Sequence, residues 1–301
     1  MKADLHVHTY FSGYSKLPFL SGVVKESYNT PNQVYGIAKA RGMDLIAITD
    51  HDSIDGALEL SDHSDVLVGS EVTAEFPNDQ TCVHLNVLDI TAHQHREIQR
   101  LRVDIRQLMP YLQSQKIFTS LNHLASGITG PITGTHVAAL LPWIDAVEIR
   151  NGSRLLEQNR TAVGVATGNN KTGIAGSDAH TPYGIGRTWT DARAASTKNE
   201  FLRELRNGRV TVHGKHGGYL RMSIDILQTS YSFYLDRLRR VVRKPLDWRR
   251  QAFWWCGLLG LPLITAPLVA MVGHFLLEER FNRELIFDLT AHRVLSQQEI
   301  V

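Results

Sequence analysis

Cysteine is nearly absent from this sequence, which contains only Cys82 and Cys256. Two cysteines are too few for a disulfide framework or for a zinc site built from thiolates, so a reducing compartment is the simpler expectation. The first ten residues, MKADLHVHTY, also lack the long apolar run of a secretory signal. We therefore expect the main domain to stay in the cytoplasm.

The chain also lacks an excess of charge of either sign. Its 32 Lys and Arg residues nearly balance its 30 Asp and Glu residues, which leaves a formal net charge of +2. This balance argues against nucleic-acid binding by the molecule as a whole, so any basic surface must be local. Internal repeats and low-complexity tracts are absent too. A chain of 301 residues, 43% of them hydrophobic, can form one large domain with an appendage.

Short runs with β character recur in the first two-thirds of the chain, and each ends in polar residues. They are ADLHVH, DLIAITDHD, VLVGSEV, CVHLNVL, FTSLNHL, DAVEIRNG and TGIAGSDAH. Two of the segments between them, 31–41 and 95–114, have helical character, and Ile98, Leu101 and Ile105 follow one another at helical spacing. Strands alternating with helices predict βα units around a parallel sheet, and about seven repeats favour a barrel.

The first of these runs ends in His6-Val7-His8. Alternate residues of a strand point to the same face, so both imidazoles can reach one ion. Alone, this pattern is a weak signal, because such histidines are more often surface or satisfied core residues. However, the ends of five further runs supply Asp50, His51, Asp52, Glu71, His84, His123, Asp178 and His180. The carboxyl ends of barrel strands converge, so six runs each bring His, Asp or Glu to one mouth.

The chemistry of these residues indicates a polynuclear metal site. Imidazole and carboxylate ligands without thiolates suit Zn, Mn or Fe, and a carboxylate between histidine-rich groups can bridge two ions. Two such cations a few ångströms apart polarise phosphoryl oxygens, lower the pKa of a bound water and stabilise a leaving oxygen. Hydrolysis of this kind requires no nucleophile from the protein.

The motifs DLHVHT, ITDHDS, GSEVT, VHLNVL, LNHLA and GSDAH, in that order, resemble the PHP (polymerase and histidinol phosphatase) family over about residues 1–190. The following IGRTWTDA is similar to the PHP-associated segment of some members. The resemblance implies an α/β fold, a distorted (β/α)7 barrel of PHP type with up to three metals. We therefore place a metallophosphoesterase domain at 1–220, with the PHP-associated segment at about 184–220.

The resemblance also assigns ligands to two or three divalent ions. It implies that His6, His8, Glu71 and Asp178 hold the first metal, that Glu71 bridges to a second completed by His84 and His123, and that His51 and His180 hold a third. Many members have Asp or His just after the Ser of the first motif, whereas this chain has Gly13 and Tyr14. We therefore expect a weaker or substrate-dependent third site.

Several further roles stay open at this point. His180 or His51 can serve as the acid that protonates the leaving group, and Arg187 can clamp a phosphate or form a surface ion pair. Three aspartates either orient imidazoles or cap strand ends: Asp4, Asp50 and Asp52. The remaining histidines of interest are expected to be surface or structural residues: His63, His93, His95, His136, His213, His216 and His274.

The carboxy-terminal third has a different composition. Residues 252–277 contain no Asp, Glu, Lys or Arg. This uncharged segment is long enough to form a transmembrane helix. The alternatives are a buried helical hairpin broken at Pro262 and Pro267, or an oligomer contact. A basic helical linker, 221–251, precedes this segment, and a tail, 278–301, follows it. The basic residues favour anionic membrane lipid as a partner and predict a cytoplasmic catalytic domain anchored to the inner face of the cell membrane.

The expected function is metal-dependent hydrolysis of a phosphate ester by a metal-activated water. The substrate is expected to be a small phosphorylated metabolite, a nucleotide or a lipid-linked phosphate. A PHP-type exonuclease is the alternative enzyme, but residues 60–180 lack the basic, aromatic track that would bind nucleic acid. A non-catalytic metal-binding scaffold is a further alternative, and all eight ligand candidates are present, which disfavours it. Amidohydrolase-like C–N hydrolysis is disfavoured by the order of the motifs.

Overall fold

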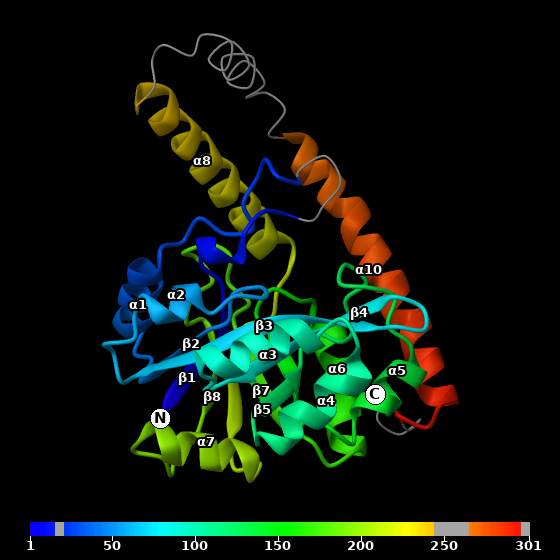
Figure 1. The fold of residues 1–301 in the computed structure, drawn as a ribbon. Coiled ribbons are helices and arrows are strands. Elements are labelled where there is room, and N and C mark those ends of the chain that lie inside the picture. Colours follow the sequence, from blue (N-terminus) through cyan, green and yellow to red (C-terminus); the bar gives the residue numbers. More distant parts are fainter. Residues whose placement is uncertain (16–20, 244–264, 296–301) are drawn as a thin grey trace.

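The computed structural model describes residues 1–15, 21–243 and 265–295, and nine of its strands form one sheet (Figure 1). Their order in the sheet is β7-β6-β5-β4-β3-β2-β1-β8-β9. Each of the seven predicted runs overlaps one of the first seven strands. The strands are β1 (Lys2–Val7), β2 (Leu45–Ile48), β3 (Val66–Phe76), β4 (Thr81–Leu88), β5 (Phe118–Leu121), β6 (Ala146–Asn151), β7 (Thr172–Gly176), β8 (Thr188–Asp191) and β9 (Thr211–Gly214).

The first seven strands curve into a nearly closed α/β barrel, as the sequence predicts. The chain just after β7 returns to β1, where the Asp178 N–H donates to the carbonyl of His6 at 2.7 Å. The His8 N–H then donates to the carbonyl of Ala179 at 3.1 Å. These bonds bring β7 and β1 together, so the residues after β1 and those after β7 become neighbours at the mouth.

The prediction of a wholly parallel sheet is wrong for the middle of the barrel. Strand β4 pairs antiparallel with both β3 and β5, while the remaining barrel pairs are parallel. The reason is the connection between β3 and β4, which contains only residues 77–80. A parallel connection needs a crossover of a dozen or more residues, whereas an antiparallel pair can be joined by a tight turn.

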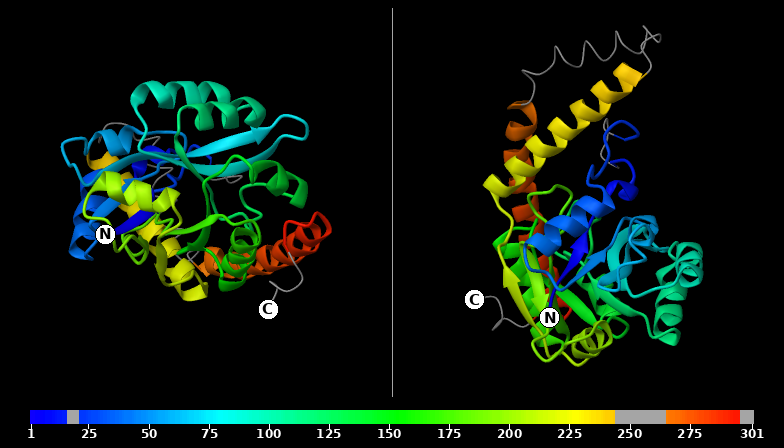
Figure 2. Two further views of the ribbon diagram at one scale, coloured as in Figure 1. Left: turned by 90° about the horizontal axis from the view of Figure 1, so that it is seen from below. Right: turned by 90° about the vertical axis from the view of Figure 1, so that its left-hand side faces the viewer.

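Short helices surround the barrel (Figure 2). They are α1 (Pro31–Ala40), α2 (Asp55–Leu58), α3 (Ala92–Leu101), α4 (Ile105–Ser114), α5 (Gly134–Leu140), α6 (Leu156–Gly168) and α7 (Lys198–Arg206), with a 3-10 turn η1 (Tyr10–Ser12). The single helix predicted at 95–114 is two helices, α3 and α4. The side chain of Asp104 accepts a hydrogen bond from the Arg106 N–H and so begins a new helix. The apolar residues that suggested one helix are nonetheless buried in both halves.

Two long helices, α8 (Tyr219–Arg243) and α10 (Thr265–Ala291), extend beyond the barrel (Figures 1 and 2). The end of α10 packs along α5 and α6. Of the predicted apolar segment 252–277, residues 252–264 lie outside the described residues, and the rest belongs to α10. This helix continues past the boundary expected at 277. Within the described parts of the chain, every helix is too short or too polar to cross a membrane.

Candidate metal centre

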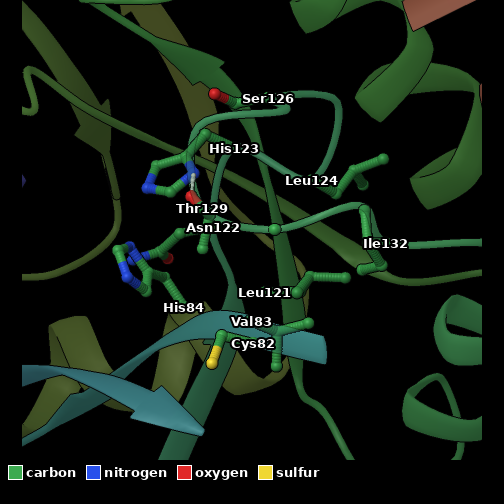
Figure 3. Close-up of a pocket in the computed structure, with 11 residues that line it drawn as sticks. Cys82, Val83, His84, Leu121, Asn122, His123, Leu124, Ser126, Thr129 and Ile132 are labelled. Carbon is green, nitrogen blue, oxygen red and sulfur yellow. Dashed lines mark hydrogen bonds between the residues drawn. The ribbon is translucent and has the colours of Figure 1, made fainter. Parts of the chain in front are cut away.

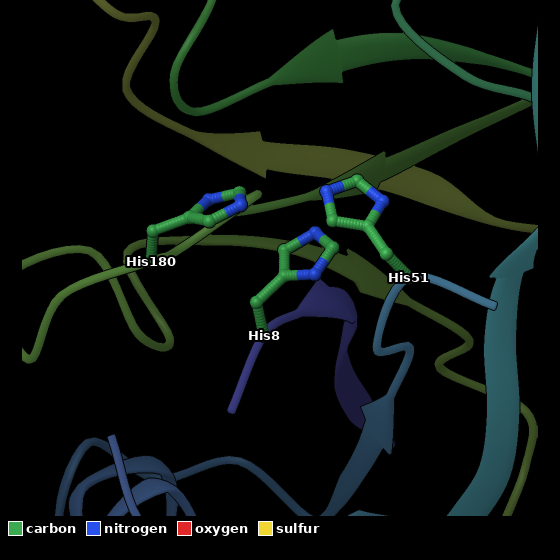
Figure 4. Close-up of side chains that lie close together, drawn as sticks. All are labelled: His8, His51 and His180. Atoms are coloured by element: carbon green, nitrogen blue, oxygen red, sulfur yellow. The ribbon is translucent and has the colours of Figure 1, made fainter. Parts of the chain in front are cut away.

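The barrel brings all eight predicted metal-binding side chains to its mouth. They come from β1, β3 and β4 and from the residues that follow β1, β2, β5 and β7: His6, His8, His51, Glu71, His84, His123, Asp178 and His180. The rings of His84 and His123 lie near each other, with centroids 5.3 Å apart (Figure 3). His8, His51 and His180 face one another on another side of the cluster (Figure 4).

Four triads among these residues have ligand atoms within 4.8 Å of one another, and they share members. The triads are His6–His8–Glu71, His6–His123–Asp178, His51–Glu71–His84 and His8–His51–His180. Glu71 Oε1 lies 2.9 Å from His123 Nε2 and 3.2 Å from His84 Nδ1. Glu71 Oε2 lies 3.1 Å from His51 Nδ1. Glu71 is therefore at the centre of one continuous cluster, where a bridging carboxylate is expected.

The triads divide the residues differently from the resemblance. His84 and His123, expected to complete one site, belong to separate triads. His51 and His180 share a triad with His8, whose ring stacks on that of His180 at a centroid distance of 4.1 Å. The predicted third metal site, His51 and His180, thus has His8 as a third candidate ligand. It has this ligand although the first motif contains Gly13 and Tyr14 where many PHP members have Asp or His.

Three buried atoms at the centre have no hydrogen-bond partner among the described residues: His51 Nδ1, Glu71 Oε2 and His84 Nδ1. All three residues belong to the same triad. A buried polar atom without a partner typically costs about 1–3 kcal/mol. Because nitrogen and oxygen donors at this spacing suit Zn, Mn or Fe, the residues present fit a divalent ion that would satisfy these atoms.

Burial and mutual interaction set the charges of the cluster. Burial opposes protonation of His6 most strongly, but surrounding carboxylates, Glu71 first among them, raise the pKa of this imidazole well above its usual value. Burial, reinforced by a neighbouring imidazole, lowers the pKa of His8 to about 3. Burial also opposes ionisation of Glu71, yet nearby histidines hold its pKa well below its usual value. Neutral His8 and ionised Glu71 are in the forms that bind metal, whereas His6 must release a proton.

Sequence reasoning missed Glu148, a buried carboxylate on β6. Its Oε1 lies 2.9 Å from His6 Nδ1, and its Oε2 accepts hydrogen bonds from the His123 N–H at 3.2 Å and from Asn151 Nδ2 at 2.8 Å. Such an outer carboxylate fixes the orientation of a ligating imidazole and raises its basicity. The signal was present in the run DAVEIRNG, because its carboxylate occupies a strand of the barrel like the other candidates.

The three aspartates have different roles. Asp50 Oδ1 accepts a hydrogen bond from Ser12 Oγ at 2.7 Å, and Ser12 Oγ lies 3.0 Å from His8 Nδ1, so this aspartate orients an imidazole through a hydroxyl. Asp4 instead accepts from backbone N–H groups between β7 and β8, and burial raises its pKa to about 6. Asp52 accepts from a backbone N–H of β3 at 2.8 Å. Capping of the backbone is therefore the role seen for Asp4 and Asp52.

Two arginines, Arg187 and Arg154, are candidates for binding the phosphate. Arg187 donates from Nε to the Tyr183 carbonyl at 2.7 Å, and its guanidinium lies 4.2 Å from the centroid of the Tyr183 ring. These contacts hold the Arg187 side chain against Tyr183, which lies in the loop after the candidate ligand His180. Arg154, which sequence reasoning missed, lies 3.5 Å from Asp178 Oδ2 and is 15% exposed. Its buried Nε has no hydrogen-bond partner among the described residues.

A small pocket borders His84 and His123 (Figure 3). Thr129 Oγ1 lies 3.5 Å from His123 Nδ1 at this side. The pocket is lined largely by apolar side chains, among them Val83, Leu121, Leu124 and Ile132. Apolar side chains therefore pack next to these two imidazoles.

Residues 157–210 match a family model described as PHP-associated. The chain contains a PHP-associated domain. This confirms the resemblance to the PHP family for that part of the chain. The match begins in α6, earlier than the start near 184 expected from the sequence, and it includes the candidate ligands Asp178 and His180.

Other known proteins share shorter or more distant similarity. An uncharacterized protein of Methanocaldococcus jannaschii is 38% identical over 77 residues, and the match covers 24% of this chain and 44% of that protein, less than half its length. The structure of PsfC from Pseudomonas syringae has a TM-score of 0.51 at 13% identity and covers 77% of this chain and 97% of that one. A protein of Bifidobacterium adolescentis assigned as a metal-dependent phosphoesterase has a TM-score of 0.48 at 15% identity and covers 69% of this chain and 96% of its own. At these identities the structural similarity concerns the fold alone.

Proposed function

We propose that this protein is a metal-dependent hydrolase that acts on a small phosphate ester. The observation that carries the proposal is the triad around Glu71. Three of its buried nitrogen and oxygen atoms have no hydrogen-bond partner among the described residues, and five further candidate ligands surround them. Bound divalent ions would polarise the phosphoryl oxygens and supply an activated water. Two or three ions of Mn, Zn or Fe are the expected cofactors.

Residues of the chain hold and orient the candidate metal ligands. Glu71 joins neighbouring triads, and Glu148 and Ser12 orient the rings of His6 and His8. These fixed contacts keep the imidazoles in place while the substrate binds and leaves, which reduces the reorganisation that the reaction requires.

Arg154 is the residue that we propose for binding the phosphate. Its guanidinium lies beside the candidate ligand Asp178, so it can contact a phosphoryl group placed against the cluster. Guanidinium donors match the geometry of phosphate oxygens and remain charged at all relevant pH values. This role replaces the one expected for Arg187, whose Nε donates to the Tyr183 carbonyl.

His180 is the better of the two candidates for protonating the leaving group. Its side chain is 26% exposed, compared with 14% for His51, and it therefore lies closer to the incoming substrate. His51 Nδ1 instead faces Glu71 at 3.1 Å, as expected of a metal ligand. Imidazole titrates near physiological pH, which suits it to proton transfer.

The test is reconstitution of the full-length protein with Mn, Fe or Zn under anaerobic conditions, followed by elemental analysis and assays on phosphate monoesters, phosphate diesters and amides. We expect at least two ions per chain, and monoester hydrolysis that chelation abolishes and Mn or Zn restores. Asp178→Asn and His8→Ala should each reduce hydrolysis by several orders of magnitude, whereas His93→Ala, at an exposed histidine on α3, should not. One ion or none, or activity in a fully demetallated sample, would contradict the proposal. Faster cleavage of diesters or nucleic acid would favour the nuclease.

Anionic lipid is the second partner that we infer, and this part rests on the charge pattern. The last two turns of α8 contain Arg237, Arg239, Arg240 and Arg243. Basic residues near an anionic surface contribute about 1 kcal/mol each. We expect the full-length protein to sediment with phosphatidylglycerol vesicles at low ionic strength and to be released by high salt, and not to sediment with phosphatidylcholine vesicles. Protein that stays unbound in both would remove lipid-linked phosphates from the substrate search.

A further inference from the structure

Helix α10 contacts the barrel through specific polar side chains. Glu278 is 4% exposed, and its Oε2 accepts hydrogen bonds from the Gly127 N–H, at 3.3 Å, and from Gln158 Nε2. One turn further along, Asn282 Oδ1 accepts from Thr161 Oγ1 at 2.8 Å. Each of these partners has fixed geometry, so the bonds determine the rotation and height of α10 on the barrel in a way that apolar contacts alone would not.

One partner of Glu278 belongs to the loop that begins with the candidate ligand His123, and the other, on α6, is bonded to this loop. Gly127 is in this loop, and Gln158 Nε2 also donates to the carbonyl of Ala125 at 2.9 Å. His123 has a positive φ of 24°, a conformation that a non-glycine residue adopts only when its surroundings enforce it. The loop therefore needs external support, and Glu278 supplies it directly at Gly127 and, through Gln158, at Ala125.

Close packing between α10 and this loop leaves little room for movement. A Cβ placed on Gly127 would lie 3.1 Å from the Cγ atom of Phe281, so the helix and the loop approach at a position that only glycine fits well. A shift of α10 would therefore be transmitted to the backbone that follows His123 rather than absorbed by a gap.

Gln158 also connects Glu278 to the loop that contains Arg154. Gln158 Oε1 accepts a hydrogen bond from the Leu155 N–H at 3.0 Å, which ties the residue after Arg154 to the start of α6. His274, one turn before Glu278 on α10, is half-buried on this side. Burial lowers the pKa of His274. The charge of Arg154 lowers this pKa further, whereas the charge of Glu278 raises it. Helix α10 thus lies close to both the candidate ligand loop and the candidate phosphate-binding loop.

We propose that Glu278 is a positioning residue of the metal centre, which holds His123 through the 123–127 loop and Arg154 through Gln158. The inference rests on the metal-binding part of the proposed function. Helix α10 then supports the metal centre, whereas the sequence predicts only a carboxy-terminal tail at 278–301.

The test is metal titration of full-length Glu278→Gln without substrate. The amide keeps the size of the side chain but removes the negative charge. Because both donors bond the same oxygen of Glu278, the amide carbonyl can accept the two hydrogen bonds only more weakly than the carboxylate does. We expect one of the bound ions to be held about 10-fold more weakly, the size of effect known for residues outside the ligand shell. The KM for a phosphate monoester should rise in parallel, because Arg154 also loses support.

Glu284→Gln is the matched control, since Glu284 is on the same helix, is 63% exposed and pairs only with Arg280 among its described contacts. Gly127→Ala disturbs the same loop from the other side and should weaken the same ion if Glu278→Gln does not fold. Asn282→Ala removes a bond between α10 and α6 outside this loop, and should lower thermal stability with metal affinity unchanged.

Equal weakening of metal binding in Asn282→Ala and Glu278→Gln would show that any loosening of α10 has this effect, and would overturn the specific role of Glu278. Wild-type affinity in both Glu278→Gln and Gly127→Ala would also overturn it, while the proposed function would stand. If the wild-type protein itself binds no metal, the proposed function fails, and this inference fails with it.

Discussion

The barrel mouth and the contact of α10 with the barrel both bury polar side chains, but they do so in opposite ways. At the mouth, His51 Nδ1, Glu71 Oε2 and His84 Nδ1 face one another without hydrogen-bond partners among the described residues. On α10, Glu278 and Asn282 each accept from a donor on the barrel. The first region has polar atoms that need a ligand, and the second has polar atoms that the fold already satisfies.

The comparison shows how a binding site differs from a structural contact when both are buried. An unsatisfied cluster lowers the stability of the folded protein until a ligand occupies it, whereas a satisfied pair contributes to stability at all times. Stability that depends on metal should therefore come from the mouth, and stability that does not should come from the α10 contact.

Glu71→Gln should have the largest effect, because Glu71 belongs to two of the four triads. We expect the metal content to fall by at least one ion and hydrolysis to fall by several orders of magnitude, since both the water and the charge stabilisation are lost. Elemental analysis and kinetic assays measure these changes. Glu157→Gln, at a 59% exposed residue of α6, is the control. Wild-type metal content in Glu71→Gln would refute its central position.

Removal of metal from the wild-type protein should lower its thermal stability. An ion present at about 1,000 times its Kd stabilises the folded state by about 4 kcal/mol, which corresponds to a decrease in Tm on the order of 10 °C after chelation. Differential scanning calorimetry with and without chelator measures the change. An unchanged Tm would mean that the three atoms without partners do not hold an ion.

Glu148→Gln should weaken metal binding by about 10–100-fold, because the orientation and basicity of the His6 imidazole depend on this carboxylate. Competition with a chromophoric chelator measures the affinity. The effect should be smaller than that of Glu71→Gln, since Glu148 contacts a ligand rather than serving as one. If the affinity is lost completely, Glu148 is itself a ligand, and if it is unchanged, the contact with His6 has no role in binding.

Asn282→Ala should have the smallest effect, a loss of about 1 kcal/mol in the free energy of unfolding, because it removes one buried hydrogen bond from α10. The loss should be the same in metal-loaded and chelated protein. Thermal unfolding in both states measures it. A loss that appears only in loaded protein would show that the two regions are coupled through this contact as well.

The sequence by itself determined much of the mouth. Each of the seven runs forms a strand, and every predicted ligand reaches the cluster. The reason is local for most ligands: a strand's alternation places His6 and His8 on one face, and the carboxyl ends of the parallel barrel strands meet at the mouth. His84 instead reaches the cluster from within β4, which runs antiparallel to its neighbours. The apolar spacing of Ile98, Leu101 and Ile105 also identified buried positions correctly, although it did not reveal that two helices share them.

Tertiary structure alone decided the rest, because it depends on contacts between residues far apart in the chain. The antiparallel position of β4, the proximity of Glu148 to His6 and the placement of Arg154 beside Asp178 all follow from the order of strands in the sheet. The contact between Glu278 and Gly127 joins residues 151 positions apart. No periodicity or motif encodes such a pair, since its energy exists only once the barrel has formed and α10 has packed against it.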